Sequence, residues 1–368
     1  MLGWFRVGEA RALLAVLLLA QVSALALSQP EEGWLTIGGD FSRSWAYPDD
    51  IGPALQLSHR ENLRCLGRFI AVVKGRILVS CGSRILCLGA GYEEEWEYRD
   101  VSSITGIAAS SGKVYVATLS GYVRALSLSD GRELWSYNTM KRRVLTPVVA
   151  GGVAVFPTAG GTIYALSEST GSLAWVYRVG SPVAVPPTLS GGVVVVGDVE
   201  GMVYALNVST GRLLWARSCG AAITTMMPAS DSEVFVAAGS TVHCVEVASG
   251  RELWSYDVGG RVESASLPEN LVVATRRGRV VSLTPGGVPA WQCDLGVEPA
   301  SPILAAGSYL YLVLVNRSLV RVELGSGRAV GVTEAEAGVE LAVADKKLYM
   351  LSRAVSYTHL TLPTTERV

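Results

Sequence analysis

The sequence predicts an all-β fold, an eight-bladed β-propeller of four-stranded blades. Three observations lead to this prediction: a tryptophan that recurs at a regular interval, a short apolar strand that recurs eight times, and a composition rich in glycine with little charge. Short buried strands separated by glycine turns give such a composition. No segment of useful length has the 3.6-residue period of an amphipathic helix.

The tryptophan repeat is clearest between Ala205 and Trp215, where glycine follows a small residue by six positions and tryptophan follows after four more. The spacings between successive tryptophans are 39, 40, 40, 39 and 37 residues. A period near 40 residues that holds four short strands is typical of a propeller blade. The tryptophans of this series, here called the anchor tryptophans, are Trp96, Trp135, Trp175, Trp215, Trp254 and Trp291.

The second strand of each unit is the easiest to count, because a turn pair such as Lys74-Gly75 precedes it. We expect the first strand of each blade to line the axis and the tryptophan strand to lie outermost. The eight second strands are predicted at residues 77–80, 114–117, 154–156, 193–196, 234–237, 271–274, 309–315 and 348–351.

The eighth blade lacks two strands at its C-terminal end and is expected to be incomplete without help from the N-terminus. Propellers close by borrowing a strand from the other terminus, which removes an exposed edge. The stretch Trp34–Asp40 is predicted to supply it, with Trp34 as the missing anchor. The propeller is then expected to span residues 30–355, and residues 356–368, which have no turn glycine or anchor, to be a non-native or disordered tail.

The N-terminus has the features of a secretory signal peptide, predicted over residues 1–26. Arg6 and Arg11 precede an apolar run over residues 12–20, and Ala24-Leu25-Ala26 offers small residues for cleavage. This predicts an extracytoplasmic protein that is secreted, periplasmic or exposed on the cell surface. Membrane contact is expected only through this segment, if it stays uncleaved.

The six cysteines are expected to be mostly free and buried rather than a disulfide framework. Cys87 and Cys244 stand where alanine stands in other repeats, so their sites favour a small buried side chain. Cys81 and Cys87 flank a hairpin turn and are poorly opposed for pairing.

The residues of the repeat are interpreted as structural. A glycine at the turn accepts backbone angles that a Cβ disfavours. A tryptophan at a strand end buries a large apolar surface between units, and its indole N–H needs a carbonyl partner. The turn glycines of the four most regular repeats are Gly131, Gly171, Gly211 and Gly250.

The pattern Ala-Leu-x-x-x-Thr-Gly-x-x-x-Trp resembles the repeat of the quinoprotein-like, or PQQ-like, propeller family, over about residues 60–353. The segment Trp34…Gly38-Gly39-Asp40 is similar to the entry segment of secreted, non-enzymatic members, which include a propeller of the outer-membrane assembly machinery. For enzymes of the family, the resemblance implies pyrroloquinoline quinone (PQQ), a calcium ion, a catalytic aspartate and a disulfide between adjacent cysteines. This chain has no adjacent cysteine pair, and Asp198 and Glu200 are more simply explained as an exposed turn.

The function predicted is a non-catalytic scaffold without cofactor, metal or catalytic residues, which binds another protein or a cell-surface macromolecule. With a formal net charge of −1, the chain has no positive electrostatic field that would attract nucleic acid. The run Lys141-Arg142-Arg143 is interpreted as a solvated loop. A PQQ-dependent dehydrogenase and a propeller that binds a small ligand or sugar stay open as alternatives. Polar residues predicted at the mouth of the channel are Arg142, Arg261, Glu263 and Glu298, of which Arg261 is expected to pair with Glu263.

Overall fold

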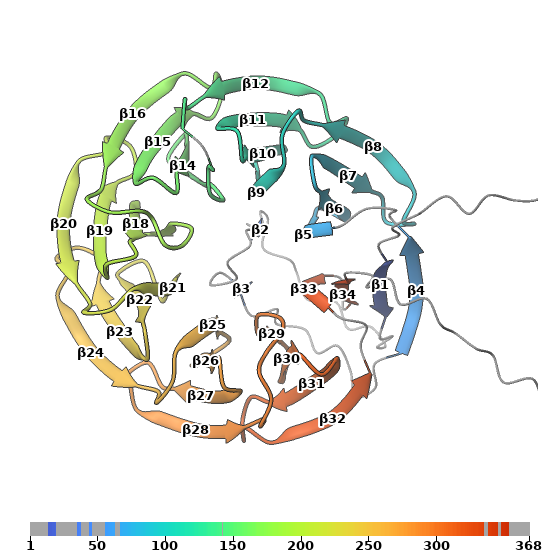
Figure 1. Cartoon of the computed structure of the whole chain (residues 1–368), viewed down its shortest axis with the longest axis vertical. Helices are drawn as coiled ribbons and strands as arrows, with labels where there is room; N and C mark the ends of the chain where they lie inside the picture. Colours follow the sequence, from blue (N-terminus) through green and yellow to red (C-terminus); the bar gives the residue numbers. More distant parts are fainter. Residues whose placement is uncertain are drawn as a thin grey trace, which may run out of the picture.

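The computed structural model describes residues 14–19, 35–37, 44–45, 56–62, 67–141, 143–334, 338–344 and 347–352. These residues form eight antiparallel four-stranded sheets around a common axis, and two of the sheets carry one further short strand (Figure 1). The first strand of each blade lies nearest the axis and the fourth strand lies outermost. The predicted eight-bladed propeller is therefore confirmed.

The blades follow one another along the chain in the order of their strands. Blades one and two comprise β5 (Gly67–Val73), β6 (Arg76–Cys81), β7 (Arg84–Leu88), β8 (Glu94–Arg99), β9 (Ile104–Ser110), β10 (Lys113–Thr118), β11 (Tyr122–Ser127) and β12 (Glu133–Asn138). Blades three and four comprise β13 (Val148–Ala150), β14 (Val153–Pro157), β15 (Thr162–Ser167), β16 (Leu173–Arg178), β17 (Thr188–Ser190), β18 (Val193–Gly197), β19 (Met202–Asn207) and β20 (Leu213–Ser218). Blades five and six comprise β21 (Ile223–Pro228), β22 (Glu233–Ala238), β23 (Thr241–Glu246), β24 (Glu252–Asp257), β25 (Val262–Leu267), β26 (Leu271–Thr275), β27 (Arg279–Leu283) and β28 (Pro289–Asp294). Blade seven comprises β29 (Leu304–Ala306), β30 (Tyr309–Val313), β31 (Ser318–Glu323) and β32 (Ala329–Glu334).

The position of a strand within its blade explains its composition. The second strands β14 and β18 are buried at every residue, because a neighbouring blade packs on each face of the sheet, and they are almost entirely apolar. The outer strand β16 instead alternates, and Trp175 is its buried residue. The core thus lies in the seams between blades rather than in one central cluster.

The eighth blade is closed by the N-terminus, as predicted, but by other residues than expected. It combines β33 (Gly338–Ala344) and β34 (Lys347–Ser352) with β1 (Leu14–Leu19) and β4 (Gln56–Asn62). Leu14–Leu19 is the apolar run assigned above to the signal peptide, and β4 directly precedes the first strand of blade one, as the outer strand of every other blade precedes the next inner strand.

The prediction that Trp34–Asp40 closes this blade is wrong, because β2 (Leu35–Ile37) pairs with β9 in blade two. A closing outer strand has to lead straight into blade one, and β4 does so, whereas β2 lies much earlier in the chain. Trp34 itself, and the tail over residues 356–368, lie outside the described residues.

Two N-terminal strands lie close to the axis of the ring (Figure 1). β2 adds an antiparallel strand to the inner edge of blade two, and β3 (Ser44–Trp45) adds a parallel strand to the inner edge of blade six. The inner edges of these two blades are therefore covered by the chain's own N-terminal part.

Cys87 and Cys244 are free and buried, as predicted. Burial raises the pKa of each thiol to about 12, so both stay protonated and unreactive. Cys81 is an exception to the expectation of free cysteines, since it forms a disulfide. Among the described residues, no helix has the length and apolar character to span a bilayer.

Candidate functional site

The two faces of the ring are built from different connections. In an antiparallel four-stranded blade, the turns between strands one and two and between strands three and four share one face, here called the hairpin face. The loops between strands two and three share the opposite face, here called the link face, with the links between blades. Backbone hydrogen bonds join the connections of each face: Leu128 N donates to Gly112 O on the hairpin face (2.9 Å), and Leu119 N donates to Ser103 O on the link face (2.8 Å).

The anchor tryptophans lie in the seams between blades. Each indole N–H donates to a backbone carbonyl of the following blade, at 2.5–3.1 Å. The accepting carbonyls, in order from Trp96 to Trp291, belong to Leu128, Glu168, Val208, Val247, Pro285 and Leu324.

Each anchor tryptophan also packs on a turn glycine of the following blade. Gly211 has a φ of +68°, and a Cβ added to it would stand 2.5 Å from Cδ2 of Trp175. These glycines are therefore required by close approach as well as by backbone angle. This pairing across the seam was not predicted from the sequence. It holds for Gly131 with Trp96, Gly171 with Trp135, Gly250 with Trp215, Gly287 with Trp254 and Gly327 with Trp291.

Three of the predicted channel-mouth residues take part in exposed ion pairs. Arg261 pairs with Glu263 at 3.4 Å, and Glu298 pairs with Arg276 at 3.3 Å, a partner that sequence patterns did not indicate. The two pairs adjoin, because Arg276 N donates to Arg261 O at 2.9 Å. Arg142 lies outside the described residues.

These residues do not fit the calcium and quinone centre that the resemblance implies for enzymes. Both carboxylates, Glu263 and Glu298, face a guanidinium rather than converging with other oxygen ligands, whereas calcium takes six to eight oxygens. No three histidine, cysteine, aspartate or glutamate side chains gather as a metal site in the part of the chain that the structure describes.

Asp198 is buried, so the expectation of an exposed turn is wrong for this residue. Its carboxylate accepts hydrogen bonds from the backbone N–H groups of Glu200 (3.0 Å) and Met202 (2.8 Å) and from the Tyr204 hydroxyl (3.3 Å). In blade three, Thr158 accepts from the equivalent turn N–H (3.1 Å). The buried carboxylate accepts hydrogen bonds from the backbone N–H groups of the turn, so its role is structural.

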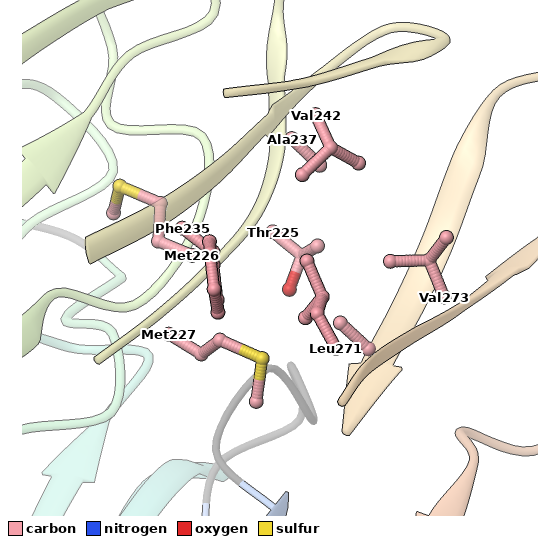
Figure 2. A pocket seen from close by; sticks show the side chains of 9 residues that line it. Thr225, Met226, Met227, Phe235, Ala237, Val242, Leu271 and Val273 are labelled. Atoms are coloured by element: carbon pink, nitrogen blue, oxygen red, sulfur yellow. The ribbon is translucent and has the colours of Figure 1, made fainter. Parts of the chain in front are cut away.

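A small apolar cavity lies between blades five and six (Figure 2). Met226, Met227 and Phe235 line it from blade five, and Leu271 and Val273 line it from blade six. Its polar side chain is Thr225, whose hydroxyl has no hydrogen-bond partner among the described residues. In the described part of the chain, the cavity is lined by no charged side chain and by no group of polar side chains that point toward one another. It therefore lacks the groups that would orient a ligand or carry out a reaction.

A cluster of exposed apolar side chains lies on the link face, around blade two. Val101 is 89% exposed, Leu119 47% and Met140 82%. Their three loops are joined by hydrogen bonds, since Ser120 N donates to Ser102 Oγ (3.0 Å) and Arg143 N donates to Leu119 O (2.8 Å). We call Val101, Leu119, Met140, Lys141 and Arg143 the blade-two cluster.

Hydrogen bonds hold the part of the loop that carries Met140. Met140 has a φ of +55°, an unusual angle for a residue with a side chain, and its N–H donates to Asn138 Oδ1 (2.9 Å). The Thr139 hydroxyl donates to Gly121 O (2.9 Å), and the Tyr164 hydroxyl donates to Thr139 O (2.9 Å). A strained conformation persists where its surroundings impose it, and here it presents a large apolar side chain to solvent. The interpretation of this loop as merely solvated missed Met140, although an apolar residue beside a basic run was visible in the sequence.

The comparisons with known proteins are consistent with the repeat. The family model described as outer membrane protein assembly factor BamB matches residues 120–221 and 199–345, which together cover more than half of the chain. This chain belongs to the BamB family of PQQ-like propellers. The resemblance stated from the repeat is thereby confirmed.

Solved structures share the fold of this BamB-family chain. BamB from Moraxella catarrhalis superposes with a TM-score of 0.63 at 17% identity, covering 79% of this chain and 95% of that one. The computationally designed Ika8 protein gives a TM-score of 0.66 at 17% identity, covering 77% and 92%. Quinohemoprotein alcohol dehydrogenase from Comamonas testosteroni gives 0.63 at 13% identity, covering 90% and 79%. Such identities establish the fold alone, and no curated protein matches this sequence.

Proposed function

We propose that this chain is a non-catalytic scaffold that binds a partner protein through its link face. The observation that carries the proposal is the blade-two cluster, in which rigid loops expose Val101, Leu119 and Met140. Apolar side chains gathered on one surface of a soluble protein mark interaction sites. The family supports the proposal, since its description is that of an assembly factor.

We further propose an extracytoplasmic location, with residues 1–26 as a signal peptide. Its cleavage would remove β1 from blade eight, so another segment would have to take its place between β34 and β4. The basic and apolar pattern of the N-terminus supports the signal peptide. The disulfide at Cys81 supports the location, because disulfides persist in oxidising compartments. N-terminal sequencing of protein purified from its natural host tests this proposal, and a first residue before position 20 would contradict cleavage of this segment.

A quinone-dependent dehydrogenase is the second candidate, since such an enzyme shares the fold. The ion pairs of Glu263 and Glu298 speak against it, because both carboxylates are engaged by arginine. Calorimetric titration of the purified chain with PQQ and calcium is expected to give no saturable heat. Saturable, calcium-dependent binding would favour the dehydrogenase.

Photo-crosslinking in the natural host tests the scaffold. A photoreactive phenylalanine analogue is placed at Leu119, Val199 or Val315 on the link face, all exposed. Matched controls carry it at Ser129, Ser169 or Ser209, which are exposed on the hairpin face. We expect discrete protein adducts from link-face positions and few from the controls. Adducts from neither face, or equally from both, would contradict the proposal.

A further inference from the structure

Resting on the proposed function, the geometry points to the chemistry of the partner: we infer that the blade-two cluster binds a protein segment that carries acidic side chains beside apolar ones. The partner segment would place its apolar residues on Val101, Leu119 and Met140. Its carboxylates would face Lys141 and Arg143. Neither the repeat nor the family description assigns this site.

The three apolar residues of the site stand on adjoining loops. The three loops of the cluster are joined through Ser102, Ser103 and Leu119 by the hydrogen bonds given above. Val199 and Val315 are also exposed, but the links to which their N–H groups donate, at Pro182 and Glu298, carry none of the large exposed apolar side chains of the described residues. Apolar side chains gathered on adjoining loops can anchor a partner in a way that single residues do not.

The hydrogen bonds around Met140 favour binding. Met140 is fixed by its neighbours Asn138 and Thr139, and Thr139 is held in turn by Gly121 and Tyr164. A surface that is ordered before binding loses little conformational entropy when a partner arrives. Met140 keeps its positive φ with its side chain exposed to solvent.

The charge of the cluster selects acidic residues. Lys141 and Arg143 are exposed, and neither pairs with a carboxylate among the described residues. The carboxylate next to Val101 is that of Asp100, which is fully buried and already paired with Arg124 at 2.6 Å. The cluster therefore presents uncompensated positive charge, and complementary charge on a partner speeds and orients its association.

A membrane surface with anionic lipids is the other ligand that combines apolar and acidic groups. The observations favour a protein, because the formal net charge of the chain is −1 and the basic run Lys141-Arg142-Arg143 holds only three charges. Attraction to an anionic bilayer relies on larger basic clusters.

Photo-crosslinking followed by sequencing of the adduct tests the inference. The analogue is placed at Met140 or Val101, with Val199 as a matched exposed position on the same face. We expect the adducts at Met140 and Val101 to dominate, and the crosslinked partner peptide to contain aspartate or glutamate beside apolar residues. The double change Lys141→Gln with Arg143→Gln should lower the yield at Met140 about tenfold through weaker electrostatic attraction.

The outcomes separate this inference from the proposed function. Adducts at Val199 and Val315 but not at Met140 or Val101 would overturn the inference and leave the scaffold intact. Absence of adducts at every link-face position would overturn both. A basic or neutral partner peptide, or an unchanged yield in the double variant, would overturn the acidic specificity. Flotation with phosphatidylglycerol vesicles that is lost in the double variant, without a protein adduct, would assign the cluster to a membrane.

Discussion

The contacts in the seams between blades are repeated almost unchanged, whereas the loops of the link face vary from blade to blade. In six successive seams a tryptophan donates to a carbonyl of the next blade and packs on a glycine there, so the contact scarcely varies. On the link face, the loop between the second and third strands differs among blades two, three, four and six. It includes Leu119 in blade two, Ala159 in blade three, Val199 in blade four and Arg276 in blade six.

The difference separates the residues that build the ring from those that distinguish this chain. A repeated contact contributes in the same way at each seam and carries no information about a partner. A loop that is free to vary carries the binding groups on a rigid frame. We therefore expect substitutions in the seams to change stability and substitutions on the link face to change binding.

The largest effect on stability is expected from Trp175→Ala. Trp175 is buried and donates to Val208 O at 2.8 Å, so its loss should cost about 3–5 kcal/mol in the free energy of unfolding. Leu173→Ala, on the same strand but 45% exposed, should cost at most about 0.5 kcal/mol. Chemical denaturation measures both, and equal losses would contradict the role assigned to the seam.

Gly211, on which Trp175 packs, should contribute almost as much to the free energy of unfolding. Gly211→Ala adds a Cβ at a positive φ and against the Trp175 ring, which should cost about 2–4 kcal/mol. Gly192→Ala is the control, because that glycine has a φ of +76° but no atom within 4 Å of the added Cβ. The control should therefore cost less, and thermal unfolding of the two variants measures the difference. Equal losses would show that close approach to the ring is unimportant.

A stabilising change is expected in the seam between blades five and six. Thr225 is 2% exposed and its hydroxyl lacks a partner among the described residues, so Thr225→Val should stabilise the chain by about 1 kcal/mol (Figure 2). The neighbouring Thr224 hydroxyl donates to Ala237 O at 3.3 Å, so Thr224→Val should instead destabilise by about 1 kcal/mol. The two midpoints of urea unfolding should move in opposite directions, and movement in the same direction would refute the assignment.

The seam between blades four and five should respond to pH. Glu252 accepts from Arg217 at 2.7 Å and lies 2.9 Å from His243 Nδ1. Although burial opposes ionisation, the hydrogen bond from His243 and the Arg217 charge lower the pKa of Glu252 below its ordinary 4.5. A lowered folded-state pKa stabilises the fold above pH 4.5, and this stability is lost as the pH falls through the folded value.

Glu252→Gln is the variant that isolates this contribution. It should flatten the fall in stability below pH 4.5 by less than about 1 kcal/mol, because the pair is partly exposed. The free energy of unfolding of the variant and of the wild type is measured between pH 3 and pH 7, a range that includes the ordinary pKa of 4.5. A variant that loses stability with pH as steeply as the wild type would contradict the lowered pKa.

The sequence predicted the regular part of the molecule because an anchor tryptophan recurs in six successive blades and packs on a turn glycine of the next. It did not predict the partner of each anchor, since the contact joins Trp175 to Gly211 in a different repeat. The closing strands were misplaced because Leu14–Leu19 has the composition of a secretory segment, and pairing with β34 depends on contacts distant in sequence. Met140 was missed because exposure is a property of the folded loop.

The division between a structural seam and a binding face is tested most directly by one measurement on Met140→Ser. The purified variant is titrated with the partner captured at the link face, and its free energy of unfolding is measured on the same sample. Since Met140 is 82% exposed, its stability should change by less than about 0.5 kcal/mol, while the Kd should rise at least about tenfold. A Kd equal to that of the wild type, or a loss of stability as large as that of Trp175→Ala, would contradict the account.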